Sequence, residues 1–248
     1  MAEYQVSNIG MTNTSKSEPW GISGSWLKVI AIIAMFADHA SKYWFSNFEW
    51  CNHQLLQIGG LPITVFFVLS SVVGRLAFPI FAFLLVEGYS HTRSFRSYAL
   101  NLLVFALISI IPYNLMHGYL WHWRGFNVLF TLLLGLLGIR AIDTYSRVKS
   151  TCVVVALFAV ALIVGVDYGL RGLAFIMLLH LLRQRRLYQA IAAGSMFMGK
   201  ITSICAMLAF IPIGLYNGQR GFIHGKVGKY LVYSFYPLHL LLIYLCAR

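Results

Sequence analysis

The first long apolar stretch of the chain spans residues 26–45 and reads WLKVIAIIAMFADHASKYWF. A helix that crosses a bilayer needs about 20 largely apolar residues, so this stretch predicts a transmembrane helix. It nevertheless carries two ionisable neighbours, Asp38 and His39, about two-thirds of the way along. A charged side chain at the centre of such a helix costs about 2.5–3.5 kcal/mol on insertion scales. The stretch therefore predicts a membrane protein with a functional site inside the membrane.

The composition of the whole chain also indicates a membrane protein. Of the 248 residues, 59% are hydrophobic and only 10% are charged, whereas about 25% is typical of a soluble domain. Basic residues outnumber acidic ones by 19 to 7, which gives a net charge of +12. Hydrocarbon excludes acidic side chains and cytoplasmic loops collect bases, so this charge does not indicate a nucleic-acid-binding protein. We expect the lipid bilayer as a partner and no nucleic acid.

No motif in the sequence is typical of a metal site. The four cysteines show no CxxC spacing. His117 and His122 stand five positions apart without a third ligand. We interpret Trp121 and Trp123, on either side of His122, as residues of a membrane-interface belt. No metal cofactor is expected.

Further apolar stretches predict an all-α polytopic bundle of about nine transmembrane helices, within a range of roughly eight to ten. The clearest stretches are residues 26–45, 72–87, 98–116, 127–139, 151–166, 168–182 and 230–246. Residues 61–73 are expected to form a separate or interfacial helix, and residues 187–216 two short spans divided at Gly199-Lys200. Residues 1–25 are polar and predict a disordered tail. Residues 26–248 are then one transmembrane domain.

The placement of bases predicts that the N-terminus is cytoplasmic. With that orientation, the inside connections hold most of the loop bases, which are Arg93, Arg96, Arg140, Arg147, Lys149, Arg183, Arg185, Arg186, Arg220, Lys226 and Lys229. The outside connections hold only Arg124, Arg171 and Lys200. The positive-inside rule expects this imbalance. The inside bases can also hold an anionic cofactor at the cytoplasmic face.

Asp38 and His39 should act separately, because neighbouring residues on a helix point about 100° apart. Asp38 can pair with Lys42 one turn on, or with Arg75 from the next strong span. Arg75 lies at a similar depth, where it can also bind a carboxylate or stabilise developing negative charge. Pro79 should kink the span that carries Arg75.

Several further polar residues are expected at the outer half of the membrane and predict one polar cavity there. They are Asn127, Asp167, Tyr168, Lys200, Tyr236 and His239. Helix capping explains Asn127 and Asp167 equally well, and ordinary solvation explains Glu87 at the cytoplasmic end of its span. The His, Asp, Arg and Tyr side chains of such a cavity suit proton transfer and oxyanion stabilisation.

Five motifs, in order along the chain, resemble the TraX family. They are LKVIAIIAMFADHAS at residues 27–41, Gly74-Arg75 followed by AFPIFA at 77–82, NVLF at 127–130, DYG at 167–169 and FYPLH at 235–239. The resemblance covers about residues 25–247. The named member of that family acetylates the N-terminus of the conjugative F-type pilin. The family is grouped with the acyltransferase-3-like transmembrane acyltransferases.

The resemblance implies an acetyltransferase of the bacterial cytoplasmic membrane. It would move an acetyl group from cytoplasmic acetyl-CoA to an amine or hydroxyl of an exported acceptor, which is a pilin N-terminus, another peptide or a glycan. His39 would be the general base or a transient acyl carrier, and Asp38 would tune it through Arg75 or Lys42. Arg75 and Asn127 would stabilise the oxyanion. The phosphates of coenzyme A would bind inside bases, namely Arg93, Arg96, Arg140, Arg183, Arg185 and Arg186.

Two other functions remain open on the residues alone. A proton-coupled transporter or flippase would use Asp38, His39 and His239 as a relay. A non-catalytic assembly scaffold would need none of these ionisable groups. Residues 51–73 are longer and more apolar than expected for the pilin-modifying enzyme, which leaves the acceptor open.

Overall fold

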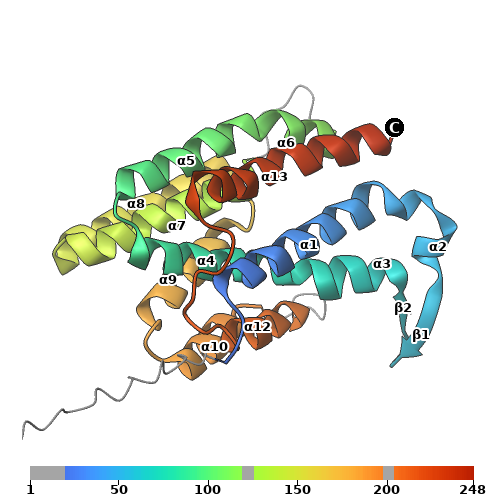
Figure 1. The fold of residues 1–248 in the computed structure, drawn as a ribbon, viewed down its shortest axis with the longest axis horizontal. Coiled ribbons are helices and arrows are strands. Elements are labelled where there is room, and N and C mark those ends of the chain that lie inside the picture. The colour runs from blue at the N-terminus through green and yellow to red at the C-terminus, as the bar shows by residue number, and fades with distance from the viewer. Residues whose placement is uncertain (1–19, 119–125, 198–203) are drawn as a thin grey trace, which may run out of the picture.

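The protein is a mostly helical bundle with one short hairpin (Figure 1), seen in a computed structural model that describes residues 20–118, 126–197 and 204–248. The longer helices are α1 (Gly24–Tyr43), α4 (Ala77–His91), α5 (Phe95–Ile108), α7 (Val128–Thr144), α8 (Arg147–Val164), α9 (Gly169–Leu181) and α13 (Gly225–Cys246). The shorter ones are α2 (Glu49–Asn52), α3 (Val65–Phe67), α6 (Ile110–His117), α10 (Arg186–Ser195) and α12 (Phe210–Gly214). The prediction of a helical fold is confirmed.

A two-stranded antiparallel sheet corrects the all-α prediction. Strand β1 (Gln54–Ile58) pairs with β2 (Leu61–Thr64), so residues 61–64 are not the start of a helix. Gly59 and Gly60 join the strands, and both have positive φ. A two-residue turn of this kind requires that conformation, which glycine adopts without steric cost. The Gly-Gly pair between two apolar runs was the sequence signal for a hairpin.

One continuous helical stretch, Val65–His91, replaces the two helices expected between residues 61 and 87. Within it a π-helical segment (Val68–Val73) and a 3-10 turn (Gly74–Leu76) precede α4. Pro79 lacks a backbone N–H and its ring collides with the carbonyl of residue 75 in a regular helix. The departure from α-geometry therefore falls in the turns that precede Pro79, and it contains Arg75.

The helices approach one another closely through small side chains. On α1, Ala31, Ala34 and Ala40 are buried at helical spacing against neighbouring elements. On α7, a Cβ at Gly135 would lie 2.5 Å from the side chain of Ile176, and one at Gly138 would lie 2.2 Å from that of Met177. Small residues of this kind let helix backbones pack tightly in membranes. They position α1 against α4 and α7 against α9.

Exposed apolar surface indicates that the bundle lies in a membrane. Only Ala161 of α8 is buried, while Val155 and Ile163 are 61% and 83% exposed. A helix that presents such residues all around it fits a lipid environment. Among the described residues, four helical stretches are long and apolar enough to cross a bilayer, namely Val65–His91, Phe95–His117, Arg147–Val164 and Gly225–Cys246. The count of about nine spans stays a prediction.

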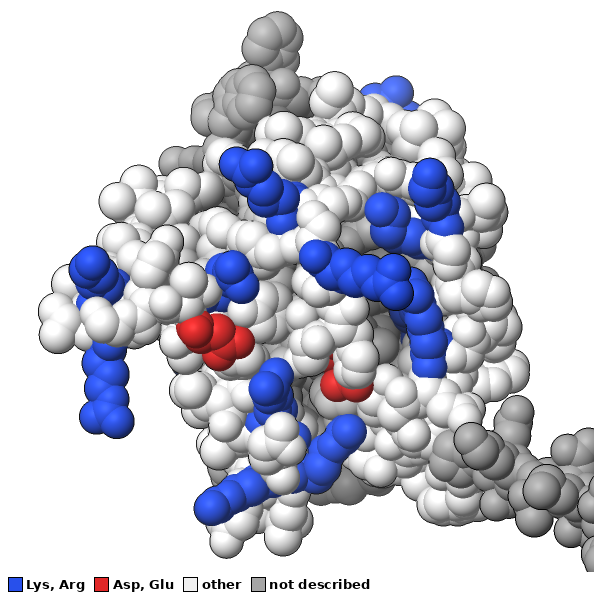
Figure 2. Space-filling model, turned by 60° about the vertical axis from the view of Figure 1, so that its left-hand side comes forward, with Lys and Arg blue, Asp and Glu red and all other residues white. Residues whose placement is uncertain are grey.

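Basic side chains gather at one end of the bundle. Figure 2 shows Lys and Arg over the face that comes forward from the left-hand side of Figure 1, where α4 ends and α5 and α8 begin. We call this face the basic end. Which side of the membrane it faces stays a prediction. Residues 20–25 are not part of the tail, because Ile22 and Gly24 form backbone hydrogen bonds with residues 215–219.

Candidate active site

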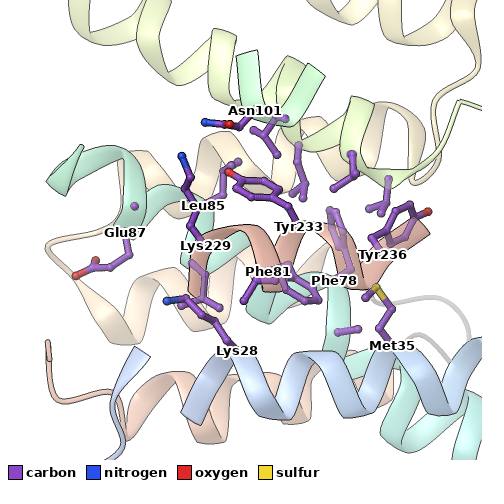
Figure 3. A pocket seen from close by; sticks show the side chains of 18 of the residues that line it. Lys28, Met35, Phe78, Phe81, Leu85, Glu87, Asn101, Lys229, Tyr233 and Tyr236 are labelled. Atoms are coloured by element: carbon purple, nitrogen blue, oxygen red, sulfur yellow. The ribbon is translucent and has the colours of Figure 1, made fainter. Parts of the chain in front are cut away.

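A cavity of about 1240 Å³ runs through the bundle between α1, α4, α5, α7 and α13. At the basic end its walls include Lys28, Arg93, Arg220 and Lys229. Figure 3 shows Lys28, Lys229 and Glu87 toward one end of this cavity and Met35 and Tyr236 toward the other. Asp38, His39 and Arg75 line the same cavity. Because Lys28 and His39 lie on one helix, they are separated by about 16 Å along its axis.

His39 is held by a second buried histidine. Its Nδ1 lies 2.9 Å from Nε2 of His239, and Nδ1 of His239 lies 2.8 Å from the carbonyl oxygen of Phe235. A carbonyl only accepts, so Nδ1 of a neutral His239 carries the proton and its Nε2 accepts. His39 must then donate from Nδ1, which leaves Nε2 of His39 unprotonated. This inferred arrangement suits a general base.

Asp38 pairs with Lys42 and not with Arg75. Lys42 Nζ donates to Asp38 Oδ2 at 2.7 Å, whereas no ion pair joins Asp38 to Arg75 in the described part of the chain. The other carboxylate oxygen, Oδ1, is buried without a hydrogen-bond partner. Gly74 makes room for it, because a Cβ there would lie 2.7 Å from Oδ1. Of the two predicted partners of Asp38, Lys42 is the one found.

Arg75 and Tyr168 form the wall opposite α1. Both residues line the cavity, and Nε of Arg75 is buried without a hydrogen-bond partner. The Tyr168 ring stacks on Phe78 with centroids 3.9 Å apart. Tyr168 is the one non-glycine residue in the described ranges with positive φ, at 61°. This conformation is costly for a bulky residue, and the Phe78 stack and the Asp167 Oδ1 bond to its N–H hold it in place.

Asn127 has a structural role outside the cavity. Its Oδ1 accepts from the backbone N–H of Leu129, which caps α7, and its Nδ2 donates to the carbonyl oxygen of Ala106 on α5. It is fully buried and does not line the cavity. Thr131 extends this connection by donating to the backbone carbonyl of Asp167. The capping interpretation of Asn127 is therefore the one that the contacts support.

We expect Asn127→Ala to lower the free energy of unfolding by about 1–3 kcal/mol, since it removes a cap and leaves the Ala106 carbonyl unsatisfied. Thermal unfolding in detergent measures the effect. Asn52→Ala is the control, because Asn52 is exposed and donates only to nearby carbonyls. Equal unfolding temperatures for the two variants would contradict this role.

Comparison with known proteins identifies the family. The profile of the TraX family, described as TraX protein, matches residues 23–247. The chain belongs to the TraX family. It is also 30% identical over 245 residues to the probable fimbrial assembly protein FimC, serogroup H1, of Dichelobacter nodosus, with 88% of this chain and 92% of that protein covered. No solved structure matches the chain.

The TraX motifs converge in the structure. Asp38 and His39 from the first, Arg75 from the second and Asp167 and Tyr168 from the fourth all line the large cavity. Tyr236 of the closing motif lines it too. His239 of the same motif is not among the described lining residues, but it contacts His39. Lys200 lies outside the described residues. Glu87 lines the cavity near the basic end and accepts a hydrogen bond from the Tyr216 hydroxyl at 3.3 Å.

Most of the arginines that the TraX resemblance suggested for coenzyme A lie away from the cavity, and among them only Arg93 lines it. Arg140 lies over the Phe95 ring, Arg183 donates to Ser90, and Arg186 lies over Phe83. Three further bases line the cavity at the basic end. Arg220 and Lys229 belong to the inside bases that the sequence offered for an anionic cofactor in general, whereas Lys28 was not predicted for this role. Each lies near the start of α1 or α13, whose pairing at the basic end no sequence pattern revealed.

His117 and Tyr113 also line the cavity, and neither was predicted as a site residue. His117, at the end of α6, lines the cavity, and its ring centroid lies 4.0 Å from that of Tyr113 and 5.1 Å from that of Tyr43. The sequence placed His117 at the membrane interface beside Trp121, which lies outside the described residues. The available signal was the four-residue spacing from Tyr113, which puts both rings on one face of a helix.

Proposed function

We propose that the protein is a membrane-embedded acetyltransferase that uses acetyl-CoA as donor and a fimbrial or pilin-like protein as acceptor. The observation that carries the proposal is a single cavity that joins a basic end to a histidine whose Nε2 is free to accept a proton. Membership of the TraX family supports the reaction class. The relative named as a fimbrial assembly protein supports the class of acceptor.

The basic end of the cavity suits the phosphates of coenzyme A. Lys28, Arg93, and the pair Arg220 and Lys229 come from three separate parts of the chain and line the same cavity. Charge-assisted hydrogen bonds from such groups are the usual means of holding phosphate. From Lys28 the cavity extends about 16 Å along α1 to His39. An extended arm attached to the bound phosphates can occupy that length.

His39 and Arg75 supply complementary chemistry at the far end. When bound, acetyl-CoA supplies an acetyl thioester. Nε2 of His39 takes the proton from the acceptor's attacking amine or hydroxyl. The new bond forms at the thioester carbonyl carbon, the carbon–sulfur bond breaks, and the departing sulfur takes up a proton. Arg75 Nε, which is buried and unpaired, donates to the carbonyl oxygen as negative charge develops there.

Lys42 and His239 act by positioning. Lys42 neutralises Asp38, so the buried carboxylate does not oppose negative charge that develops near Arg75. His239 fixes the tautomer of His39 through the bond to the Phe235 carbonyl. Because that carbonyl carries no proton to pass on, the relay ends there. This closed relay favours a transferase over a proton-coupled transporter, which needs an onward path for the proton.

The direct test uses purified protein in proteoliposomes with acetyl-CoA labelled in the acetyl group. We expect saturable binding of acetyl-CoA and transfer of label to a fimbrial subunit presented as the acceptor. Mass spectrometry of cell-envelope proteins with and without the protein should show one lost acetyl modification. Substrate uptake without acetyl-CoA, together with failure to bind it, would instead support the transporter.

We expect Lys28→Gln and Lys229→Gln each to weaken acetyl-CoA binding about tenfold, or about 1.4 kcal/mol, because each removes a charge-assisted contact with phosphate. The loss should shrink as salt rises, since salt screens exposed charges. Lys226→Gln is a matched control, because Lys226 begins the same helix as Lys229 but does not line the cavity. Isothermal titration in detergent measures the three variants. An equal loss in Lys226→Gln would contradict a specific phosphate site.

A further inference from the structure

A second, smaller cavity adjoins the large one. Its volume is about 200 Å³, and three residues, Arg75, Phe78 and Tyr168, line both cavities. The stacked rings of Phe78 and Tyr168 therefore form part of the wall between them. Gly172 makes the stack possible, because a Cβ there would lie 2.6 Å from Cβ of Tyr168 and 3.2 Å from the Phe78 ring.

The second cavity is electrically positive. Arg171 lines it from α9 and is exposed, and Arg75 lines it as a second arginine. The first turn of α9 contributes Gly172 to the lining, and a helix N-terminus adds partial positive charge. No Asp or Glu is among the described residues that line it. The nearby carboxylate of Asp167 lines the large cavity instead.

The remaining walls are apolar. Phe175, Met196, Phe197 and Ala206 complete most of the lining. A sugar would leave its hydroxyl groups without partners against such walls. A peptide segment with one apolar side chain and one carboxylate satisfies both the apolar walls and the two arginines.

We propose that the second cavity binds the acceptor, and that the acceptor is a peptide with a carboxylate close to its reacting amine. This inference rests on the proposed function and specifies its acceptor. Arg171 binds the carboxylate at the rim, the apolar side chain packs on Phe175 and Phe197, and the amine reaches His39 past Arg75. The donor and the acceptor then meet from the two sides of the wall that Arg75, Phe78 and Tyr168 form.

The test compares three amines as acceptors for the protein in proteoliposomes with acetyl-CoA. They are the C-terminally amidated tripeptides Ala-Leu-Glu and Ala-Leu-Gln, and O-phosphoethanolamine, which has a phosphate and no apolar side chain. We expect kcat/KM for the Glu peptide to exceed that for the Gln peptide about tenfold, mainly through KM, as a single charge-assisted contact allows. O-Phosphoethanolamine should be the poorest acceptor.

The variant Arg171→Gln should abolish the preference for Glu over Gln and leave the affinity for acetyl-CoA unchanged. Arg171→Lys should keep part of the preference, since it keeps the charge. The matched control is Arg248→Gln, because Arg248 is exposed and lines neither cavity. The inference is overturned by equal rates for the two peptides, by a preference that survives Arg171→Gln, or by O-phosphoethanolamine as the best acceptor. If none of the three amines is acetylated, the proposed transferase activity fails as well.

Discussion

His39→Ala is expected to lower the rate of acetyl transfer about 10²- to 10⁴-fold, the usual contribution of a positioned general base. The affinity for acetyl-CoA should stay within about twofold of wild type, since Lys28, one of the bases proposed to hold its phosphates, lies about 16 Å away along α1. The change should therefore appear in kcat rather than in KM for the donor.

The pairing of His39 with His239 makes this expectation specific. With His39 removed, Nε2 of His239 loses its partner, but its Nδ1 stays bonded to the Phe235 carbonyl. His239 then cannot take over as base, because it does not line the cavity among the described residues. His239→Gln should lower kcat less than His39→Ala does, because it loosens the His39 ring without removing it.

Labelled acetyl-CoA and the Ala-Leu-Glu peptide measure both variants. The matched control is His224→Ala, since His224 lies at the start of α13 and does not line the cavity. Binding of acetyl-CoA by His39→Ala shows that the variant is folded. Near-normal turnover in that folded variant would remove His39 from the mechanism.

Gly74→Ala is expected to have the second large effect. A Cβ at this position would lie 2.6 Å from Cβ and 2.7 Å from Oδ1 of Asp38, and 3.0 Å from Cα of Asp38. Backbone must therefore move apart where α1 meets the 3-10 turn. Overpacking of this kind costs about 1–3 kcal/mol. Asp38 and its neighbour His39 shift with the backbone, so we also expect at least a tenfold loss of kcat, about 1.4 kcal/mol in barrier.

Gly214→Ala is the matched control, because nothing lies within 4 Å of a Cβ there and its φ is not positive. Ala also favours the helix by about 0.8–1 kcal/mol over Gly. Thermal unfolding in detergent and the transfer assay are measured on both variants. If Gly74→Ala unfolds at the same temperature as Gly214→Ala and keeps its activity, the close contact between Gly74 and Asp38 is needed for neither stability nor catalysis.

The parts of the site that lie on single helices could be predicted from the sequence. Asp38 and His39 were singled out because ionisable groups are costly in an apolar helix. Helix geometry predicted that the two side chains point in different directions. The structure confirms this, since Asp38 pairs with Lys42 and His39 contacts His239. The kink expected at Pro79 stays a prediction, and the helix before this residue is irregular, with a π-helical segment and a 3-10 turn.

The parts that depend on which helices meet could not be predicted. No sequence pattern distinguishes Lys42 from Arg75 as the partner of Asp38, because that choice depends on how α1 packs against the turn at Gly74. The sequence also contains many equivalent loop bases, and only packing separates Arg93, which lines the cavity, from Arg186, which lies over the Phe83 ring. The hairpin was not predicted, because residues 61–64 continue into the apolar stretch 61–73, which favoured a helix, whereas they pair with residues 54–58.

The regular helix between Lys28 and His39 has a consequence for the choice of donor. Its rise fixes a length of about 16 Å that rotation of side chains cannot remove. Under the proposed function, the distance along α1 between Lys28 and His39 then selects donors by their length. A short acetylating agent such as acetyl phosphate, with its phosphate held at the same bases, would leave its acetyl group far from the histidine. Only a donor long enough to place its acetyl group at His39 while its phosphate is bound would react, without any contact that recognises the nucleotide base.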